Sequence, residues 1–292
     1  NSAVTVAQGG KLIIKEAGKN GIEISKGTLT ANGELTITNV TGNGINQTGG
    51  TVNIAGEAVI TMPAAEKIGI LLTDGEMNIT GRISGVGYLI NQQGGALNLT
   101  GATVSGSQKN MIQDGGTAVI TDTTFHKTVS NNITATKGTM TLNGNVFVTG
   151  GTKDGGTHAF YINGGAVTAN GTVTISDTTG AGVRIANGSF TSAAASTVNI
   201  TGCNHGIQPN GGTVTINGAL NATDLKGSGI NMYTAGTVNI NGTMTVTNTG
   251  AHGIQMTEGT VNVASGAKLT IQNVTGNGIQ QSGGTFHANG TV

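Results

Sequence analysis

Residues 236–240 read Gly-Thr-Val-Asn-Ile, residues 259–263 read Gly-Thr-Val-Asn-Val, and residues 50–54 repeat the first of these runs. A glycine opens twelve copies of this kind, about 23 residues apart, which is the spacing of a stacked solenoid. The opening glycines are Gly27, Gly50, Gly75, Gly95, Gly116, Gly138, Gly165, Gly188, Gly212, Gly236, Gly259 and Gly284. The repeat predicts that one structural unit is stacked on itself along the chain.

Within each copy, apolar and polar residues alternate. The residues two and four places after the opening glycine are apolar in every copy, except at Ser192. Alternation over five residues predicts a strand with one buried face. A second strand carries pairs such as Leu35 and Ile37. A third strand supplies one more apolar column: Ile22, Ile45, Ile70, Ile90, Met111, Ile133, Phe160, Val183, Ile207, Ile230, Ile254 and Ile279.

The strands are separated by glycine-rich corners. Six places after the opening glycine, nine copies have another glycine, which Asn precedes in six of them, as in Asn32-Gly33. Because Gly and Asn adopt positive φ at little steric cost, we expect a tight corner of that conformation. Three short strands and three turns per copy predict an all-β fold, a right-handed three-sided parallel β-helix of about twelve coils forming one domain over residues 1–292. The alternative is a β-sandwich with glycine-rich turns. Its hairpins would not require an apolar column that repeats in phase twelve times, so the repeat favours the β-helix.

Composition limits the classes of partner. The formal net charge is zero and 9% of the residues are charged, whereas a nucleic-acid-binding protein needs a basic stripe. No stretch approaches the roughly 20 apolar residues of a membrane span. The single cysteine, Cys203, cannot form an internal disulfide and lies in a stretch that reads as exposed. The pattern continues up to Val292 and no leader precedes Asn1, so we expect a segment of a longer protein.

The run Asn-Val-Thr-Gly-Asn-Gly-Ile occurs at both 39–45 and 273–279. Coils of this style resemble the passenger domains of bacterial type V autotransporters, especially large adhesins, and the resemblance covers essentially the whole chain. It implies a secreted rod on the bacterial surface, held at the outer membrane through a C-terminal β-barrel that this chain lacks. It also implies attachment to a host or bacterial surface protein or glycan. We expect this segment to be monomeric and not inserted in the membrane.

Residues for catalysis or metal binding are scarce. Parallel β-helical polysaccharide lyases and hydrolases gather carboxylates on one strand face. Here Asp74, Asp114 and Glu258 precede opening glycines in coils that are not all adjacent, as solvated turn residues would. The five histidines lack ligand spacing; His205 and His252 occupy matching places, but two coils apart, roughly 10 Å. We expect no enzyme activity, no catalytic residue, no cofactor and no metal site.

Two coils are lengthened, near residues 61–67 and 150–158. Insertions in solenoids emerge as loops, and loops often carry recognition, although a tolerated length variation is the simpler explanation of both. The second insertion concentrates charge in a chain that has little. Lys153, Asp154 and His158 are therefore the candidate binding residues.

Three functions remain compatible with these features. The leading hypothesis is a surface-exposed adhesin segment that attaches to host or bacterial partners. The alternative is an ice- or glycan-binding solenoid that uses an outward row of Thr and Asn, including Thr51/Asn53 and Thr237/Asn239. Thr is also a common residue on any exposed strand face, and Glu76 interrupts the row. A polysaccharide-cleaving enzyme is the least supported.

Overall fold

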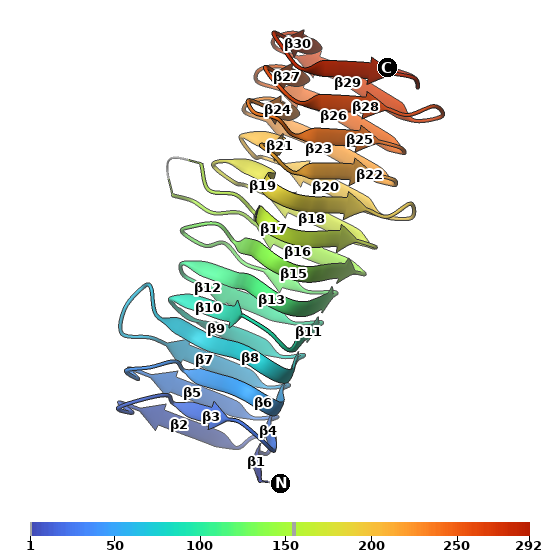
Figure 1. Cartoon of the computed structure of the whole chain (residues 1–292). Coiled ribbons are helices and arrows are strands. Elements are labelled where there is room, and N and C mark those ends of the chain that lie inside the picture. Colours follow the sequence, from blue (N-terminus) through green and yellow to red (C-terminus); the bar gives the residue numbers. More distant parts are fainter. Residues whose placement is uncertain (1, 154–155) are drawn as a thin grey trace.

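A computed structural model describes residues 2–153 and 156–292, and Figure 1 shows them as a rod of stacked coils with the N- and C-terminal ends of the chain at opposite ends. The chain winds through about twelve turns of a parallel β-solenoid. In the described part there are 31 strands and no helix. No helix there has the length and apolarity needed to cross a bilayer. The predicted fold class is confirmed.

The strands form two sheets of 19 and 12 strands. The larger sheet contains the first and third strands of the coils: β1 (Ala3–Val6), β3 (Ile22–Ile24), β4 (Thr28–Ala31), β6 (Ile45–Ile54), β8 (Ile68–Ile79), β10 (Tyr88–Gln92), β11 (Ala96–Thr100), β13 (Lys109–Thr121), β15 (Ile133–Asn143), β17 (Phe160–Ala169), β19 (Ala181–Ser192), β21 (His205–Pro209), β22 (Thr213–Ile216), β24 (Ile230–Met232), β25 (Thr237–Ile240), β27 (Ile254–Met256), β28 (Thr260–Val263), β30 (Ile279–Gln281) and β31 (Thr285–Ala288). The smaller sheet contains the second strands: β2 (Lys11–Lys15), β5 (Glu34–Thr38), β7 (Glu57–Thr61), β9 (Arg82–Val86), β12 (Thr103–Gly106), β14 (Thr124–Phe125), β16 (Asn145–Thr149), β18 (Thr172–Ser176), β20 (Thr197–Thr201), β23 (Ala219–Leu225), β26 (Thr243–Thr249) and β29 (Lys268–Val274).

The strand pairing follows the predicted apolar columns. Ile54 pairs with Ile79, which pairs with Leu99, and all three are at most 1% exposed. In the third-strand column, Ile207 pairs with Ile230, and Ile230 pairs with Ile254. Because equivalent side chains lie above one another, each coil buries its apolar residues against its neighbours. The polar exception in the pattern, Ser192, is also buried, and its hydroxyl accepts a hydrogen bond of 3.3 Å from the Gly218 amide.

The corner before the first strand differs from the expected turn. In six coils the third strand continues into the next first strand as one long bent strand: β6, β8, β13, β15, β17 and β19. The register shifts locally at the bend, as between Gln47 and Thr48. Gly50 has φ 66°, which allows the bend without breaking the strand. The buried Gln47 side chain lies inside this bend, and its Nε2 donates to the carbonyls of Gly50 (3.1 Å) and Glu76 (2.9 Å).

The corner after the first strand also differs from expectation. Of its nine glycines, only Gly101 and Gly144 have positive φ, so the prediction of that conformation was wrong for the other seven. The glycines are needed for close approach instead. A Cβ added to Gly56 would lie 2.1 Å from the Gly33 carbonyl oxygen, and one added to Gly81 would lie 2.0 Å from the Gly56 oxygen. The corners of successive coils therefore pack backbone against backbone.

Candidate functional site

The corner after the second strand carries a column of residues in the left-handed conformation. Its members lie at equivalent places in five successive coils: Asp177, Gly202, Asp224, Asn248 and Asn273. Asn and Asp tolerate positive φ better than other non-glycine residues. Their side chains also link coils, since Asn248 Nδ2 donates to Asp224 Oδ1 at 3.0 Å. We call this set the corner column, and Gly202 is the member without a side chain.

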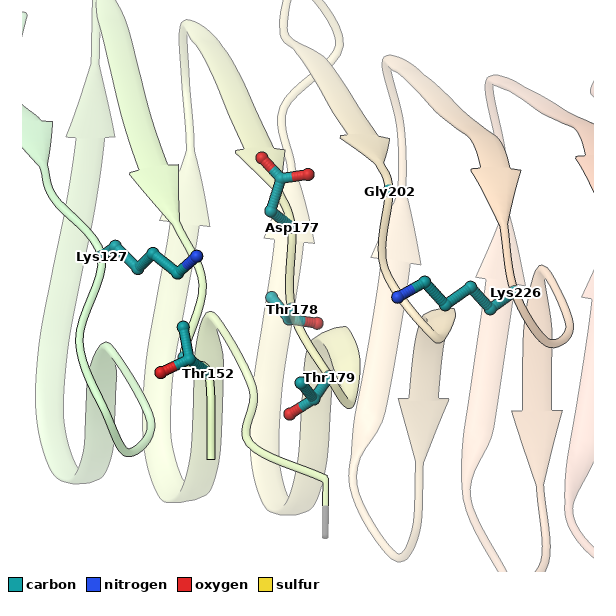
Figure 2. A pocket seen from close by; sticks show the side chains of 8 residues that line it. Lys127, Thr152, Asp177, Thr178, Thr179, Gly202 and Lys226 are labelled. Carbon is teal, nitrogen blue, oxygen red and sulfur yellow. The ribbon is translucent and has the colours of Figure 1, made fainter. Parts of the chain in front are cut away.

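A hollow of about 290 Å³ lies where the corner column loses a side chain. It is lined by Lys127, Gly151, Thr152, Asp177, Thr178, Thr179, Gly202 and Lys226. Figure 2 shows the Lys127 and Lys226 side chains extending toward one another from opposite ends, with Asp177, Thr178 and Thr179 between them. The lining comes from five successive corners, between β14 and β15 at one end and between β23 and β24 at the other.

The hollow has an excess of positive charge. Both lysines are exposed. The ion pairs within residues 2–153 and 156–292 are Lys11–Glu34 and Arg82–Glu57, so neither lysine of the hollow is paired with a described carboxylate. Asp177 contributes the one carboxylate of the lining. Two ammonium groups against one carboxylate leave one net positive charge at a surface where charged residues are rare.

The threonine hydroxyls of the hollow are held by hydrogen bonds to neighbouring residues. Thr178 Oγ1 donates to the Gly180 carbonyl at 2.7 Å, and Thr179 Oγ1 donates to the Lys153 carbonyl at 2.8 Å. Thr179 Oγ1 also accepts from the Thr157 amide at 3.3 Å and lies 2.9 Å from Thr157 Oγ1, while Thr178 is buried. The groups of the lining that remain available are therefore two cations and one anion, a mixture suited to a ligand that carries both a negative charge and hydrogen-bond donors.

The candidate residues of the insertion lie around this hollow in different ways. Lys153 is exposed, and its backbone amide donates to the Val129 carbonyl at 2.9 Å, so the start of the insertion is held by the preceding coil. Asp154 lies outside the described residues. His158 is 4% exposed, inside the corner, and thus faces no surface. A binding role for Lys153, Asp154 and His158 stays a prediction. Because His158 is buried, its part in binding would be to hold the corner in place.

His158 belongs to a column that sequence reasoning recognised only in part. Its Nδ1 accepts a hydrogen bond of 2.9 Å from the Ala181 amide. His205 and His252 make the same contact with the next coil, from the Ser228 and Asn277 amides, at 3.0 Å each. The three rings occupy equivalent corners two coils apart and connect coils. No group of three or more metal-ligating side chains forms in the part of the chain that the structure describes.

Burial changes the proton affinity of these groups. Desolvation, and next the nearby charge of Arg184, lower the pKa of His158 to about 4. Burial likewise lowers the pKa of His205. Cys203 is fully buried, which corrects the expectation of an exposed stretch, and this burial raises the pKa of its thiol. A buried, protonated thiol is a poor nucleophile.

The outward residues of the first strands form a second polar surface, which we call the Thr/Asn face. Their two columns are in register along the rod: Thr28, Thr51, Glu76, Ala96, Thr117, Thr139, Ala166, Ser189, Thr213, Thr237, Thr260 and Thr285, and Thr30, Asn53, Asn78, Asn98, Val119, Thr141, Thr168, Thr191, Thr215, Asn239, Asn262 and His287. Amide side chains link neighbouring coils, as where Asn98 Nδ2 donates to Asn78 Oδ1 at 2.8 Å and Asn78 Nδ2 to Asn53 Oδ1 at 3.0 Å.

Sequence reasoning identified the Thr/Asn face and missed the hollow. Lys127 and Lys226 are far apart in the sequence and belong to no motif. The available signal was that two of the few lysines follow second strands, at corners four coils apart. Comparison of the chain with protein-family models, with curated proteins and with solved structures gives no match.

Proposed function

We propose that this chain is a segment of a bacterial surface adhesin, a passenger-like rod displayed outside the cell that attaches to a surface protein or glycan of a host or another bacterium. The observation that carries the proposal is the Thr/Asn face. Its hydroxyls and amides keep one register over many coils and are presented by a sheet whose other side is core. The likeness of the coils to autotransporter passengers supports the same role.

A preformed polar face suits attachment without a deep pocket. Binding loses affinity when side chains must be ordered, and here the backbone and the amide chains are ordered beforehand. Asn262 Nδ2 donates to Asn239 Oδ1 at 2.8 Å, so these amides are held across coils. A standard interface covers about 800 Å² of each partner, which requires several adjacent coils of such a face. Affinity would therefore come from repeated contacts along the rod.

A matched pair of double variants tests the role of the face. Thr215→Lys with Asn239→Lys places two charges at paired positions of the Thr/Asn face, in β22 and β25. Asn221→Lys with Thr245→Lys places the same charges at paired outward positions of the second-strand sheet. Beads coated with each protein are incubated with host epithelial cells and with bacteria, at equal folded content by circular dichroism.

We expect the face variant to lose at least tenfold in bead attachment and the control variant to keep it. Equal attachment by the two variants would contradict binding through this face. Absence of attachment by the unmodified rod to every surface would contradict the adhesin proposal itself.

The second candidate is an ice- or glycan-binding solenoid, favoured by the regular spacing of the Thr columns. Positions two residues apart on a strand are about 6.6 Å apart, and coils repeat at about 4.8 Å, so Thr213, Thr215 and Thr237 are part of a flat regular array. Glu76 and Val119 interrupt it. Inhibition of ice recrystallisation by the unmodified rod, lost in the face variant, would favour this candidate. A reducing-end release assay checks the third possibility, polysaccharide cleavage, for which we expect no product.

A further inference from the structure

We propose that the hollow between Lys127 and Lys226 binds an acidic oligosaccharide, with a sugar carboxylate between the two ammonium groups. The inference rests on the proposed attachment function and assigns to it a chemical class of partner and a site apart from the Thr/Asn face.

The hollow exists because of one residue. Asp177, Gly202 and Asp224 follow one another in the corner column, and Gly202 has φ 65°, the same conformation as its Asn and Asp neighbours. A side chain there would occupy the space between coils, since an added Cβ would lie 2.7 Å from Asp177 Oδ1. An Asn at this place would continue the column as Asn248 does beside Asp224. The chain instead leaves the place open between two lysines.

The charges select an acidic sugar over a simple anion. Lys127 and Lys226 can each donate to a carboxylate, and Figure 2 shows both extending into the same space. Asp177 lies between them and repels phosphate, sulfate and a sugar carboxylate alike, so a ligand that binds here must also offer hydrogen-bond donors to this carboxylate. Toward a sugar the same carboxylate accepts hydrogen bonds from ring hydroxyls, which a bare inorganic anion cannot supply. A metal ion is not favoured, because hard cations require several oxygen ligands, and the two ammonium groups supply none and repel a cation.

The length of the hollow fits a chain of sugars better than a single ion. Lys127 and Lys226 belong to corners four coils apart, which is about 19 Å along the rod before the side chains reach inward. A volume of about 290 Å³ is near the lower end of small-molecule sites. The hollow is open at the surface, so an oligosaccharide lying along the rod can occupy it and continue beyond it.

Three variants of the full 292-residue chain test the site. Lys127→Gln with Lys226→Gln removes both cations. Gly202→Asn fills the hollow while both lysines remain, and the new amide is expected to donate to Asp177. Lys15→Gln with Lys268→Gln removes the same charge from exposed positions outside the hollow. Isothermal titration calorimetry with an oligogalacturonate, its methyl ester and inorganic phosphate measures binding, and circular dichroism checks the fold.

We expect the unmodified chain and the Lys15/Lys268 variant to bind oligogalacturonate alike, and the other two variants to lose at least tenfold in affinity. The methyl ester should bind at least tenfold more weakly, and phosphate should not compete at equal concentration. The inference is overturned if the unmodified chain does not bind, if binding survives in the Gly202→Asn variant, or if phosphate binds as well as the sugar. Cell attachment lost only in the Thr/Asn-face variant would leave the adhesin proposal standing while this site fails.

Discussion

At the scale of single residues, His158 shows how the corners use polar side chains that the apolar pattern does not predict. Its ring is buried, accepts a hydrogen bond from Ala181 and lies 3.3 Å from Arg184 Nη1 through Nε2. Such a contact requires a neutral ring, because Nδ1 must keep a lone pair and a cation beside Arg184 is unfavourable. The same Nδ1 contact recurs at His205 and His252, so a histidine ring connects neighbouring coils at each of these corners.

The lowered pKa of His158 predicts loss of stability in acid. Its pKa is about 4 in the folded protein and near 6.5 in the unfolded chain. Between these values the unfolded chain binds the proton and the folded protein does not. The contribution of neutral His158 to stability is therefore complete above pH 6.5, and the free energy of unfolding decreases as the pH falls toward 4. The expected loss is roughly 3 kcal/mol, measured by urea unfolding at pH 7.5 and pH 4.

Variants separate His158 from the other titrating groups. His158→Gln should reduce the difference between the two pH values, while His287→Gln, at an exposed position of the Thr/Asn face, should preserve it. A residual acid dependence is expected from His205, whose pKa burial also lowers. An unchanged difference in the His158 variant would mean that other groups cause the acid sensitivity.

At the scale of elements, the corner after the first strand distinguishes two reasons for a glycine. Gly81 lacks positive φ, but a Cβ there would lie 2.0 Å from the Gly56 oxygen. Gly101 has φ 63° and open space around a would-be Cβ. Gly81→Ala should therefore force coils apart and cost at least about 3 kcal/mol, whereas Gly101→Ala should cost about 1 kcal/mol from backbone strain alone. Urea unfolding measures both, and a larger loss at Gly101 would refute the close-approach explanation.

The strands could be predicted from sequence, and the site could not, for a physical reason. An apolar column is a local property: Val238, Val261 and their equivalents repeat in phase because each must fill the same core position. The hollow depends on the absence of a side chain at Gly202. Gly202 is one of 52 glycines, and its position between Asp177 and Asp224 in space is known only from the structure.

The insertion at 150–158 was a further obstacle to predicting the site. Its first part continues the stacking, since Gly151 pairs with Thr128 and the Thr152 amide donates to the Thr128 carbonyl at 3.1 Å. Sequence reasoning treated the whole stretch as a loop that leaves the rod. Lys127 could not be assigned to the same surface as Lys226 until the corners between them were placed.

At the scale of the whole molecule, the rod is a one-dimensional stack in which each coil contacts its neighbours. In proteins of this kind, stability is approximately a sum of unit and nearest-neighbour contributions. A defect in one coil should therefore be felt over a short distance. This property also suits a display rod, because local damage at one place leaves the remaining surface in register.

A buried charge at Ile240 tests both the register and this locality. Ile240 lies in β25, fully buried, paired with Ile216 on one side and Val263 on the other. Ile240→Asp places a carboxylate in the core without a partner, which should cost several kcal/mol. Hydrogen exchange should show lost protection in β22, β25 and β28, while amides of β6 and β8, many coils away, keep theirs.

The adjacent residue supplies the control for that experiment. Asn239 points outward from the same strand and accepts a hydrogen bond from Asn262 through Oδ1, an acceptor that an aspartate retains. Asn239→Asp adds the same charge one position away, and we expect its melting and exchange to match those of the unmodified chain, because the carboxylate stays in water. Equal melting of the two variants would show that position 240 does not face the core. Uniform loss of protection along the whole rod in Ile240→Asp would show that the coils unfold as one cooperative unit rather than as a chain of neighbours.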